Sequence, residues 1–109
     1  MLTYSERFRK LIDSQEQIIK LLYGCHFNSD NFPLWEQNRW FISKAINQDG
    51  TILDIGCANG FLLKCLQEWT SYRLVPFGVD TDKELIKQAK DLFSDLQNNF
   101  AELGIEEIE

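Results

Sequence analysis

The apolar residues in the first part of the chain recur every three or four positions, which is the spacing of one helix face. They are Tyr4, Phe8, Leu11, Ile12, Ile18, Ile19 and Leu22. Thr3 and Glu6 are spaced to form a capping box at the start of this segment, and Gly24 can end it. The pattern predicts a helix over residues 4 to 23.

A second helical pattern follows a loop that is predicted over residues 25 to 31. Pro33 suits the first turn of a helix, because an amide in that turn has no helical partner to lose. The apolar positions of this helix are Leu34, Trp35, Phe41, Ile42, Ala45 and Ile46. A polar turn over residues 47 to 50 then ends it. The second helix is predicted from Pro33 to about Asn47.

Beyond Gly50, short β-rich runs alternate with helical patterns. Residues 51 to 55 and 73 to 79 are predicted strands, although Pro76 is tolerated only near a strand start or edge. The helix between them carries Phe61, Leu62, Cys65, Leu66 and Trp69 on one side. The next helix has a stripe of Leu85, Ile86, Ala89, Leu92, Phe93 and Leu96, and Thr81 with Glu84 can form its capping box.

Residues 100 to 108 alternate weakly between apolar and polar positions, which favours a third strand, although Gly104 and the glutamates weigh against it. Strands that alternate with helices usually pair in parallel through right-handed crossovers, and the helices pack on the sheet. The predicted fold class is therefore α/β, with a parallel sheet and flanking helices, preceded by two N-terminal helices.

The distribution of charge limits the kinds of partner that this chain can have. Residues 51 to 109 carry eleven acidic and five basic residues, whereas residues 1 to 50 carry six of each. A nucleic-acid-binding surface usually has a basic stripe, so this portion gives no indication of nucleic acid. No apolar run approaches the length of a membrane span, and the charged N-terminus lacks the apolar run of a secretory signal.

The three cysteines, Cys25, Cys57 and Cys65, are an odd number and have no spacing typical of a metal site. We interpret them as reduced thiols, which are typical of cytoplasmic proteins. His26 is the only histidine, and we interpret it as a surface residue. We therefore predict no metal site and assign no catalytic residue.

The stretch TILDIGCANG, residues 51 to 60, joins the first predicted strand to the following helix. Ligands of parallel α/β sheets bind at this corner, where glycines allow close approach of the backbone. The dinucleotide fingerprint G-x-G-x-x-G, aligned from Gly56, meets Ala58 and Phe61 where it requires glycine. A tight structural turn alone explains Gly56, but it does not explain the acids Asp54 and Asp80 at the ends of two predicted strands.

A different pattern, D-x-G-x-G-x-G, matches Asp54, Gly56 and Gly60, with Ala58 as one conservative departure. With this pattern, residues 51 to about 98 resemble the opening half of a class I, Rossmann-like, S-adenosylmethionine-dependent methyltransferase. The segments that carry the resemblance are LDIGCANGFLL, residues 53 to 63, and FGVDTDKELIKQAK, residues 77 to 90.

The resemblance implies a role for each matching residue toward S-adenosylmethionine. Gly56, Cys57 and Ala58 would offer loop contacts, while Asp54 would hold the loop or the amino group of the cofactor. Asp80 would bind the ribose hydroxyls, because an ionised carboxylate can accept two charge-assisted hydrogen bonds from a diol. Thr81 follows this acid, at the position where the family often packs an apolar residue on the adenine. The family also has an adenine-side acid, but neither Glu102 nor Glu106 falls in a clear register, and neither is assigned.

The resemblance also divides the chain into two parts. Residues 1 to 50 would be an N-terminal helical segment, a lid or packing helices, and residues 51 to 109 the first β-α-β-α(-β) units of a cofactor-binding domain. Trp35, Arg39 and Trp40 lie where such enzymes often place a lid, although an aromatic stripe at helical spacing is more often core. The family's sheet has more strands than this chain supplies, so we expect either a longer protein or self-association through the uncovered sheet edge.

Three functions follow from these observations. The first is S-adenosylmethionine-dependent methyl transfer to an unidentified acceptor, with this chain supplying the cofactor-binding half. The second is a non-catalytic nucleoside-binding module that pairs with a partner chain. The third is an NAD-dependent oxidoreductase, which Asp80 permits but the glycine spacing disfavours.

Overall fold

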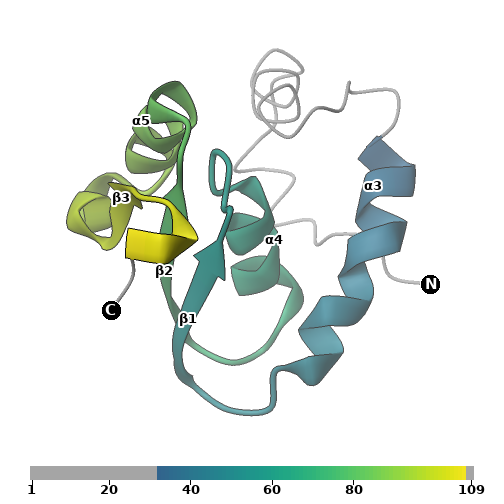
Figure 1. Ribbon diagram of the computed structural model, residues 1–109. Helices are drawn as coiled ribbons and strands as arrows, with labels where there is room; N and C mark the ends of the chain where they lie inside the picture. Colours follow the sequence, from purple (N-terminus) through teal and green to yellow (C-terminus); the bar gives the residue numbers. More distant parts are fainter. Residues whose placement is uncertain (1–31, 108–109) are drawn as a thin grey trace.

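A computed structural model describes residues 32 to 107. The helix predicted over residues 4 to 23, the loop over 25 to 31, Cys25 and His26 lie outside the described residues. Within this range the chain forms a three-stranded sheet in the order β1-β2-β3 (Figure 1). Both pairings are parallel, and the strands are β1 (Gly50–Ile55), β2 (Leu74–Asp80) and β3 (Phe100–Glu102).

The helices connect these strands in the predicted order. They are α3 (Phe32–Arg39), α4 (Phe61–Trp69) and α5 (Lys83–Leu92), with shorter 3-10 segments η2 (Trp40–Ala45), η3 (Ser94–Asn99) and η4 (Ile105–Glu107). α4 joins β1 to β2, and α5 with η3 joins β2 to β3. The parallel sheet with flanking helices confirms the prediction of an incomplete Rossmann-like α/β fold. None of the helices within residues 32 to 107 is long and apolar enough to cross a membrane.

The core lies on one face of the sheet, where α4 and α5 pack (Figure 1). One buried cluster joins α3, α4 and β2 and contains Trp35, Phe61, Cys65, Leu66, Trp69 and Leu74. The second joins the loop after β1 to α4, α5 and β3 and contains Cys57, Leu63, Ile86, Ala89, Phe93 and Phe100. Ile52 of β1 packs against both clusters, so the two helices and the sheet share one continuous apolar interior.

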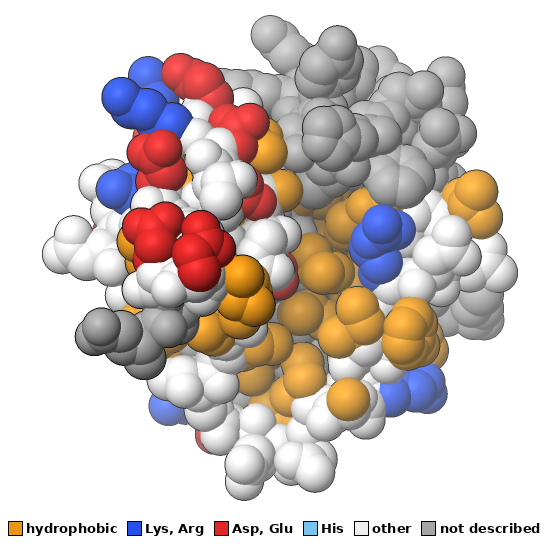
Figure 2. All heavy atoms as spheres, viewed as in Figure 1, with side chains coloured by type: hydrophobic (Ala, Val, Ile, Leu, Met, Phe, Trp, Pro, Cys, Tyr) orange, Lys and Arg blue, Asp and Glu red, His pale blue; other side chains and the backbone are white. Residues whose placement is uncertain are grey.

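The opposite face of the sheet is open. Leu53 and Ile55 of β1 are 50% and 49% exposed, and Val75 and Phe77 of β2 are 38% and 36% exposed. Leu53 is paired with Phe77, so these side chains lie together on one face. Figure 2 shows apolar side chains gathered in the middle of this view and acidic ones toward the side of α5 and β3.

Several features of the elements differ from the sequence prediction. α5 ends at Leu92, although its predicted apolar stripe runs to Leu96. The second helix continues only as far as Arg39 in α form, and residues 40 to 45 form a 3-10 segment. The Ser43 hydroxyl donates to the Trp40 carbonyl at 2.7 Å, which is a local bond that competes with the regular helical ladder. The third strand is shorter than predicted, because it ends at Glu102 and Gly104 leads into η4.

Pro76 lies in the middle of β2 and is fully buried. It is nevertheless at a local edge, because β3 pairs with β2 only from Gly78 to Asp80. At the level of Pro76 the strand therefore has β1 alone as a strand neighbour, and the Asn99 side chain donates to the Pro76 carbonyl at 3.0 Å. The restriction of proline to a strand start or edge holds here in this local sense.

Candidate functional site

The sequence-predicted site residues meet at the carboxyl end of the sheet. β1 ends at Ile55, the loop of residues 56 to 60 follows, and α4 begins at Phe61, while β2 ends beside this loop at Asp80. Three loop residues adopt left-handed backbone conformations, with φ of 79° at Gly56, 52° at Ala58 and 81° at Gly60. The loop therefore reverses direction within five residues, which glycine tolerates well and alanine does not.

The amides of this loop are bonded to β2. Gly56 N and Cys57 N both donate to the Val79 carbonyl, at 2.8 and 2.9 Å. Ala58 N donates to Oδ2 of Asp80 at 2.9 Å. A cradle for a phosphate needs several loop amides directed at the ligand, whereas these three point to the neighbouring strand. The loop is therefore unsuited to a pyrophosphate in this conformation, which weighs against a dinucleotide.

Asp80 is the acid at the tip of β2. Its Oδ2 accepts from Ala58 N and its Oδ1 accepts from Asp82 N at 2.9 Å. An ionised carboxylate has about four lone-pair sites on two oxygens, so two accepted amides leave capacity for two hydroxyl donors. Asp80 is only partly buried, and a diol can reach it. Asp80 therefore both holds the loop and presents an acceptor where the loop meets the end of β2, a place that we call the ligand corner.

Thr81 was predicted to cap α5 with Glu84, and this prediction is wrong. The cap is Asp82, whose Oδ1 accepts from Glu84 N at 2.9 Å and from Leu85 N at 3.1 Å. The short carboxylate of Asp82 reaches the first free amides of the helix, while Thr81 lies one residue too early. Thr81 is exposed beside Asp80, which leaves its side chain at the ligand corner.

Asp54 is half-buried near the end of β1, paired with Gly78 of β2. Burial raises the pKa of its carboxyl above the ordinary 3.8, and the nearby negative charge of Asp80 raises this pKa further. Asp54 pairs with Gly78, two residues before Asp80, so the two carboxylates lie at the same end of neighbouring strands. This arrangement favours a ligand that carries positive charge, since a cation would offset both the repulsion and the cost of burial.

Asp54→Asn is expected to stabilise the protein without ligand at pH 7. A carboxyl whose pKa is higher in the folded chain penalises folding above that pKa, and the penalty disappears as pH falls below the ordinary 3.8. The melting temperature of the variant should therefore exceed that of wild type at neutral pH, and the difference should shrink toward pH 4. Asp91→Asn, at an exposed position on α5, is the control. Equal melting curves at all pH values would contradict the expectation.

Ala58→Gly is expected to raise the free energy of unfolding by about 0.5 to 1 kcal/mol, because the left-handed conformation costs alanine more than glycine loses in chain entropy. The φ of 52° at Ala58 is the observation behind this prediction. Chemical denaturation measures the change. Ala45→Gly, at the exposed end of η2, has no such strain to relieve and should lower the stability. A loss of stability in Ala58→Gly would show that the strain is absent.

The Cys57 side chain is buried beneath the loop backbone rather than exposed on its outer surface. It is 3% exposed, and its Sγ donates to the Ala58 carbonyl at 3.4 Å. Cys57 can therefore offer a ligand only its backbone. Neither Cys57 nor Cys65 forms a disulfide within residues 32 to 107, and both are buried.

The sequence interpretation missed two residues of this corner. Asn59 is fully buried, and its Oδ1 accepts from Phe61 N at 3.1 Å at the start of α4. Gly78 lies against Cys57, since a Cβ at Gly78 would be 2.6 Å from the Cys57 sulfur. An asparagine just before a helix and a glycine inside a strand are both recognisable signals, the first of a cap and the second of a close approach.

The acidic residues after β2 are also placed by the sheet. Glu102 ends β3 in register with Asp80, so these two acids come from neighbouring strand ends. Glu106 instead packs over Gly104, where its carboxylate occupies the space that a Cβ would take. Of the two glutamates left unassigned from sequence, Glu102 is the one beside the ligand corner.

Trp35 belongs to the core. It is 1% exposed and contacts the rings of Phe61 and Trp69, with centroids 5.1 and 6.3 Å away. The Arg39 guanidinium lies 4.9 Å from the Trp35 ring, and Trp40 packs against the same cluster. Trp35 thus lies in the first core cluster and Trp40 packs against it, while the assignment of residues 1 to 50 as a lid or packing helices stays a prediction.

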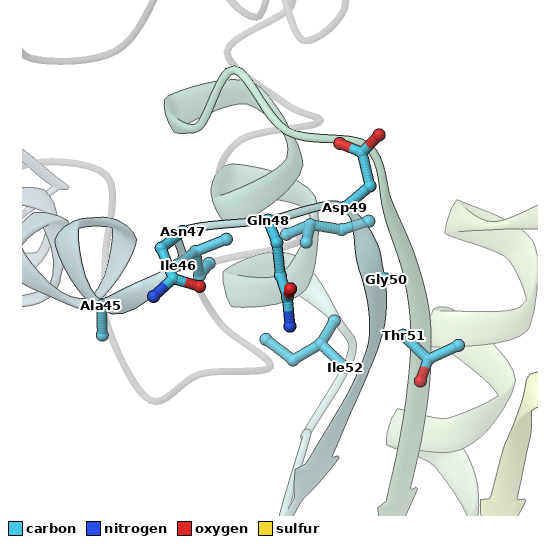
Figure 3. Close-up of a pocket in the computed structure, with 9 residues that line it drawn as sticks. Ala45, Ile46, Asn47, Gln48, Asp49, Gly50, Thr51 and Ile52 are labelled. Atoms are coloured by element: carbon cyan, nitrogen blue, oxygen red, sulfur yellow. The ribbon is translucent and has the colours of Figure 1, made fainter.

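A cavity of about 330 Å³ lies at the other end of β1 (Figure 3). It is lined by residues 45 to 52 together with Leu74. The Gln48 side chain points toward Ile52, whereas Asp49 points away and accepts from Arg73 N at 2.7 Å. Ligands of parallel α/β sheets bind outside the carboxyl ends of the strands, and this cavity is at the amino end. It is therefore separate from the candidate site.

Comparisons with known proteins bear on the resemblance to methyltransferases. No protein-family profile matches the chain. Over 74 residues the chain is 28% identical to the ribosomal protein L11 methyltransferase of Thermotoga maritima and 27% identical to that of Thermotoga petrophila. The matches cover 68% of this chain and 27% of each relative, so the chain spans about a quarter of their length. The chain is thus similar to a part of two proteins that are named as methyltransferases.

Proposed function

We propose that this chain is the cofactor-binding part of a cytoplasmic, S-adenosylmethionine-dependent methyltransferase. The observation that carries the proposal is the loop of residues 56 to 60 bonded through its amides to β2, with the Asp80 carboxylate beside it. A ligand at this corner meets carboxylates and loop backbone instead of a row of amide donors. This chemistry fits a nucleoside that carries positive charge and lacks phosphate.

The residues present fit S-adenosylmethionine in four places. Asp80 would bind the ribose diol, and Thr81 would lie against the adenine. The loop backbone at Gly56 and Ala58 would lie under the methionine portion, with Asp54 near its positive charges. When bound, the cofactor supplies a methyl group activated by its sulfonium, and the protein's part is to hold and orient it for in-line attack by the acceptor. The proposal assigns no acceptor-binding or catalytic residue within 32 to 107.

The test is a comparison of two ligands on the purified chain. S-adenosylhomocysteine at a hundredfold excess over its Kd should raise the melting temperature by about 10 °C, from a ligand stabilisation of about 2.7 kcal/mol. NADH at the same concentration should leave it unchanged. A shift with NADH alone would favour the oxidoreductase, and a folded chain with no shift from either ligand would refute the cofactor site.

A second candidate function is a nucleoside-binding module that works as a pair of chains. The open face of β1 and β2 favours it, because Leu53, Ile55, Val75 and Phe77 are exposed there and none is charged. Because none of these four side chains is charged, two copies can pack the faces together without placing like charges in the contact, although each chain has a net charge of -6. Sedimentation equilibrium should then show a dimer that Leu53→Lys separates, whereas a monomeric wild type would refute it.

A further inference from the structure

Hydrogen bonds connect the loop of the candidate site to α5 as well as to β2. The Asn59 side chain, which is fully buried, donates from Nδ2 to Oε1 of Gln88 at 3.3 Å. Gln88 lies in the middle of α5 and is partly exposed. A buried side-chain amide needs partners for its polar atoms, and Gln88 supplies one from a different element.

These hydrogen bonds form a closed circuit that passes through Asp80. Ala58 N donates to one oxygen of the Asp80 carboxylate, and Asp82 N donates to the other. Asp82 caps the start of α5, Gln88 lies further along that helix, and the bond from Asn59 to Gln88 returns to the residue next to Ala58. Within this circuit, the Asn59 to Gln88 bond connects α5 to the loop without passing through Asp80.

We infer that Gln88, through Asn59, is a positioning residue for the nucleoside-binding acid Asp80, an inference that rests on the proposed function. Without the link, the hydrogen bonds of this circuit join α5 to the loop only through the Asp80 carboxylate itself, while Cys57, Ile86 and Ala89 still pack the two elements together. That carboxylate then has to hold both elements while it also accepts the ligand hydroxyls. With the link in place, the two amides present their hydrogens to Asp80 at fixed positions, and the outward lone pairs are directed at the diol.

The test uses three substitutions at Gln88. Gln88→Met and Gln88→Lys remove the acceptor while they keep a long side chain that suits a helix, and Gln88→Glu keeps an acceptor oxygen. By calorimetry at 20 °C, the Kd for S-adenosylhomocysteine should rise about five- to tenfold in the first two variants, the effect of one hydrogen bond. In Gln88→Glu it should stay within about twofold.

A general loss of stability has to be separated from a loss of positioning. Ile86→Val weakens the packing of α5 without touching the circuit, since Ile86 is buried in the second core cluster. This variant should melt at a lower temperature yet bind S-adenosylhomocysteine as wild type does. Loss of affinity in Ile86→Val equal to that in Gln88→Met, or unchanged affinity in both acceptor-free variants, overturns the inference while wild type still binds. Absence of binding by wild type removes the proposed function itself, and this inference with it.

Discussion

Gly78→Ala is expected to lower the melting temperature by about 10 to 20 °C, the consequence of an overpacking cost of about 2 to 3 kcal/mol in a small domain. A Cβ at this position would lie 2.6 Å from Sγ and 2.9 Å from Cβ of Cys57, and 3.0 Å from Cδ1 of Phe100. Cys57 cannot easily move away, because its amide is bonded to the Val79 carbonyl. Thermal denaturation followed by circular dichroism measures the effect.

Gly56→Ala is the matched control for Gly78→Ala. Gly56 has a φ of 79°, but a Cβ there would have no heavy atom within 4 Å. The free energy of unfolding of this variant should therefore fall only by the cost of placing alanine in a left-handed conformation, about 1 to 2 kcal/mol. Cys57→Ala in the Gly78→Ala background should restore part of the lost stability, because it removes the sulfur but not the Cβ. If Gly78→Ala melted at the same temperature as wild type, this result would contradict the close packing of β2 beneath the loop.

Asp80→Ala is expected to weaken binding of S-adenosylhomocysteine by about 100-fold or more, and so to abolish the ligand-induced rise in melting temperature. Two charge-assisted hydrogen bonds to a diol are worth about 1.5 to 3 kcal/mol each, and either of them accounts for a tenfold change or more. The substitution also releases Ala58 N and Asp82 N, which the carboxylate holds at 2.9 Å. Calorimetric titration measures the affinity.

Asp80→Asn and Asp82→Ala separate the two roles of the Asp80 carboxylate. Asp80→Asn keeps an oxygen for one amide but loses the charge, so the chain should fold while its affinity falls. Asp82→Ala removes the cap of α5 at a cost of about 1 kcal/mol, yet it should bind the ligand nearly as wild type does. If Asp82→Ala lost as much affinity as Asp80→Ala, the acid at the tip of β2 would have no special role.

These variants concern one structural arrangement, in which the loop after β1 is built on β2. Gly78 makes room for Cys57 beneath the loop, Val79 binds two loop amides through its carbonyl, and Asp80 binds the third. The strand that ends in Asp80, for which we propose nucleoside binding, therefore also shapes the loop. Stability and ligand affinity are expected to be linked most strongly in these three residues.

The sequence by itself determined the order of elements beyond Gly50 and the corner of the sheet where the candidate site residues meet. Periodicity distinguished helices from strands beyond Gly50, and the alternation of the two implied a parallel sheet, whose carboxyl edge brings Asp54 and Asp80 together. The glycines at 56 and 60 were recognisable as turn residues because both need a left-handed backbone. These features depend on local conformation and on a general rule of connection, so one sequence is enough to find them.

Only the tertiary structure decided where each loop amide and buried amide group points. That Asn59 reaches Gln88 and that Gly78 lies under Cys57 both depend on distances between separate elements. That Asp82 rather than Thr81 caps α5 is a local feature, decided by which residue stands just before Lys83. The raised pKa of Asp54 likewise follows from burial and from Asp80, a residue 26 positions away in the chain. Spacing along a chain does not contain such distances, because packing sets them once the helices lie on the sheet.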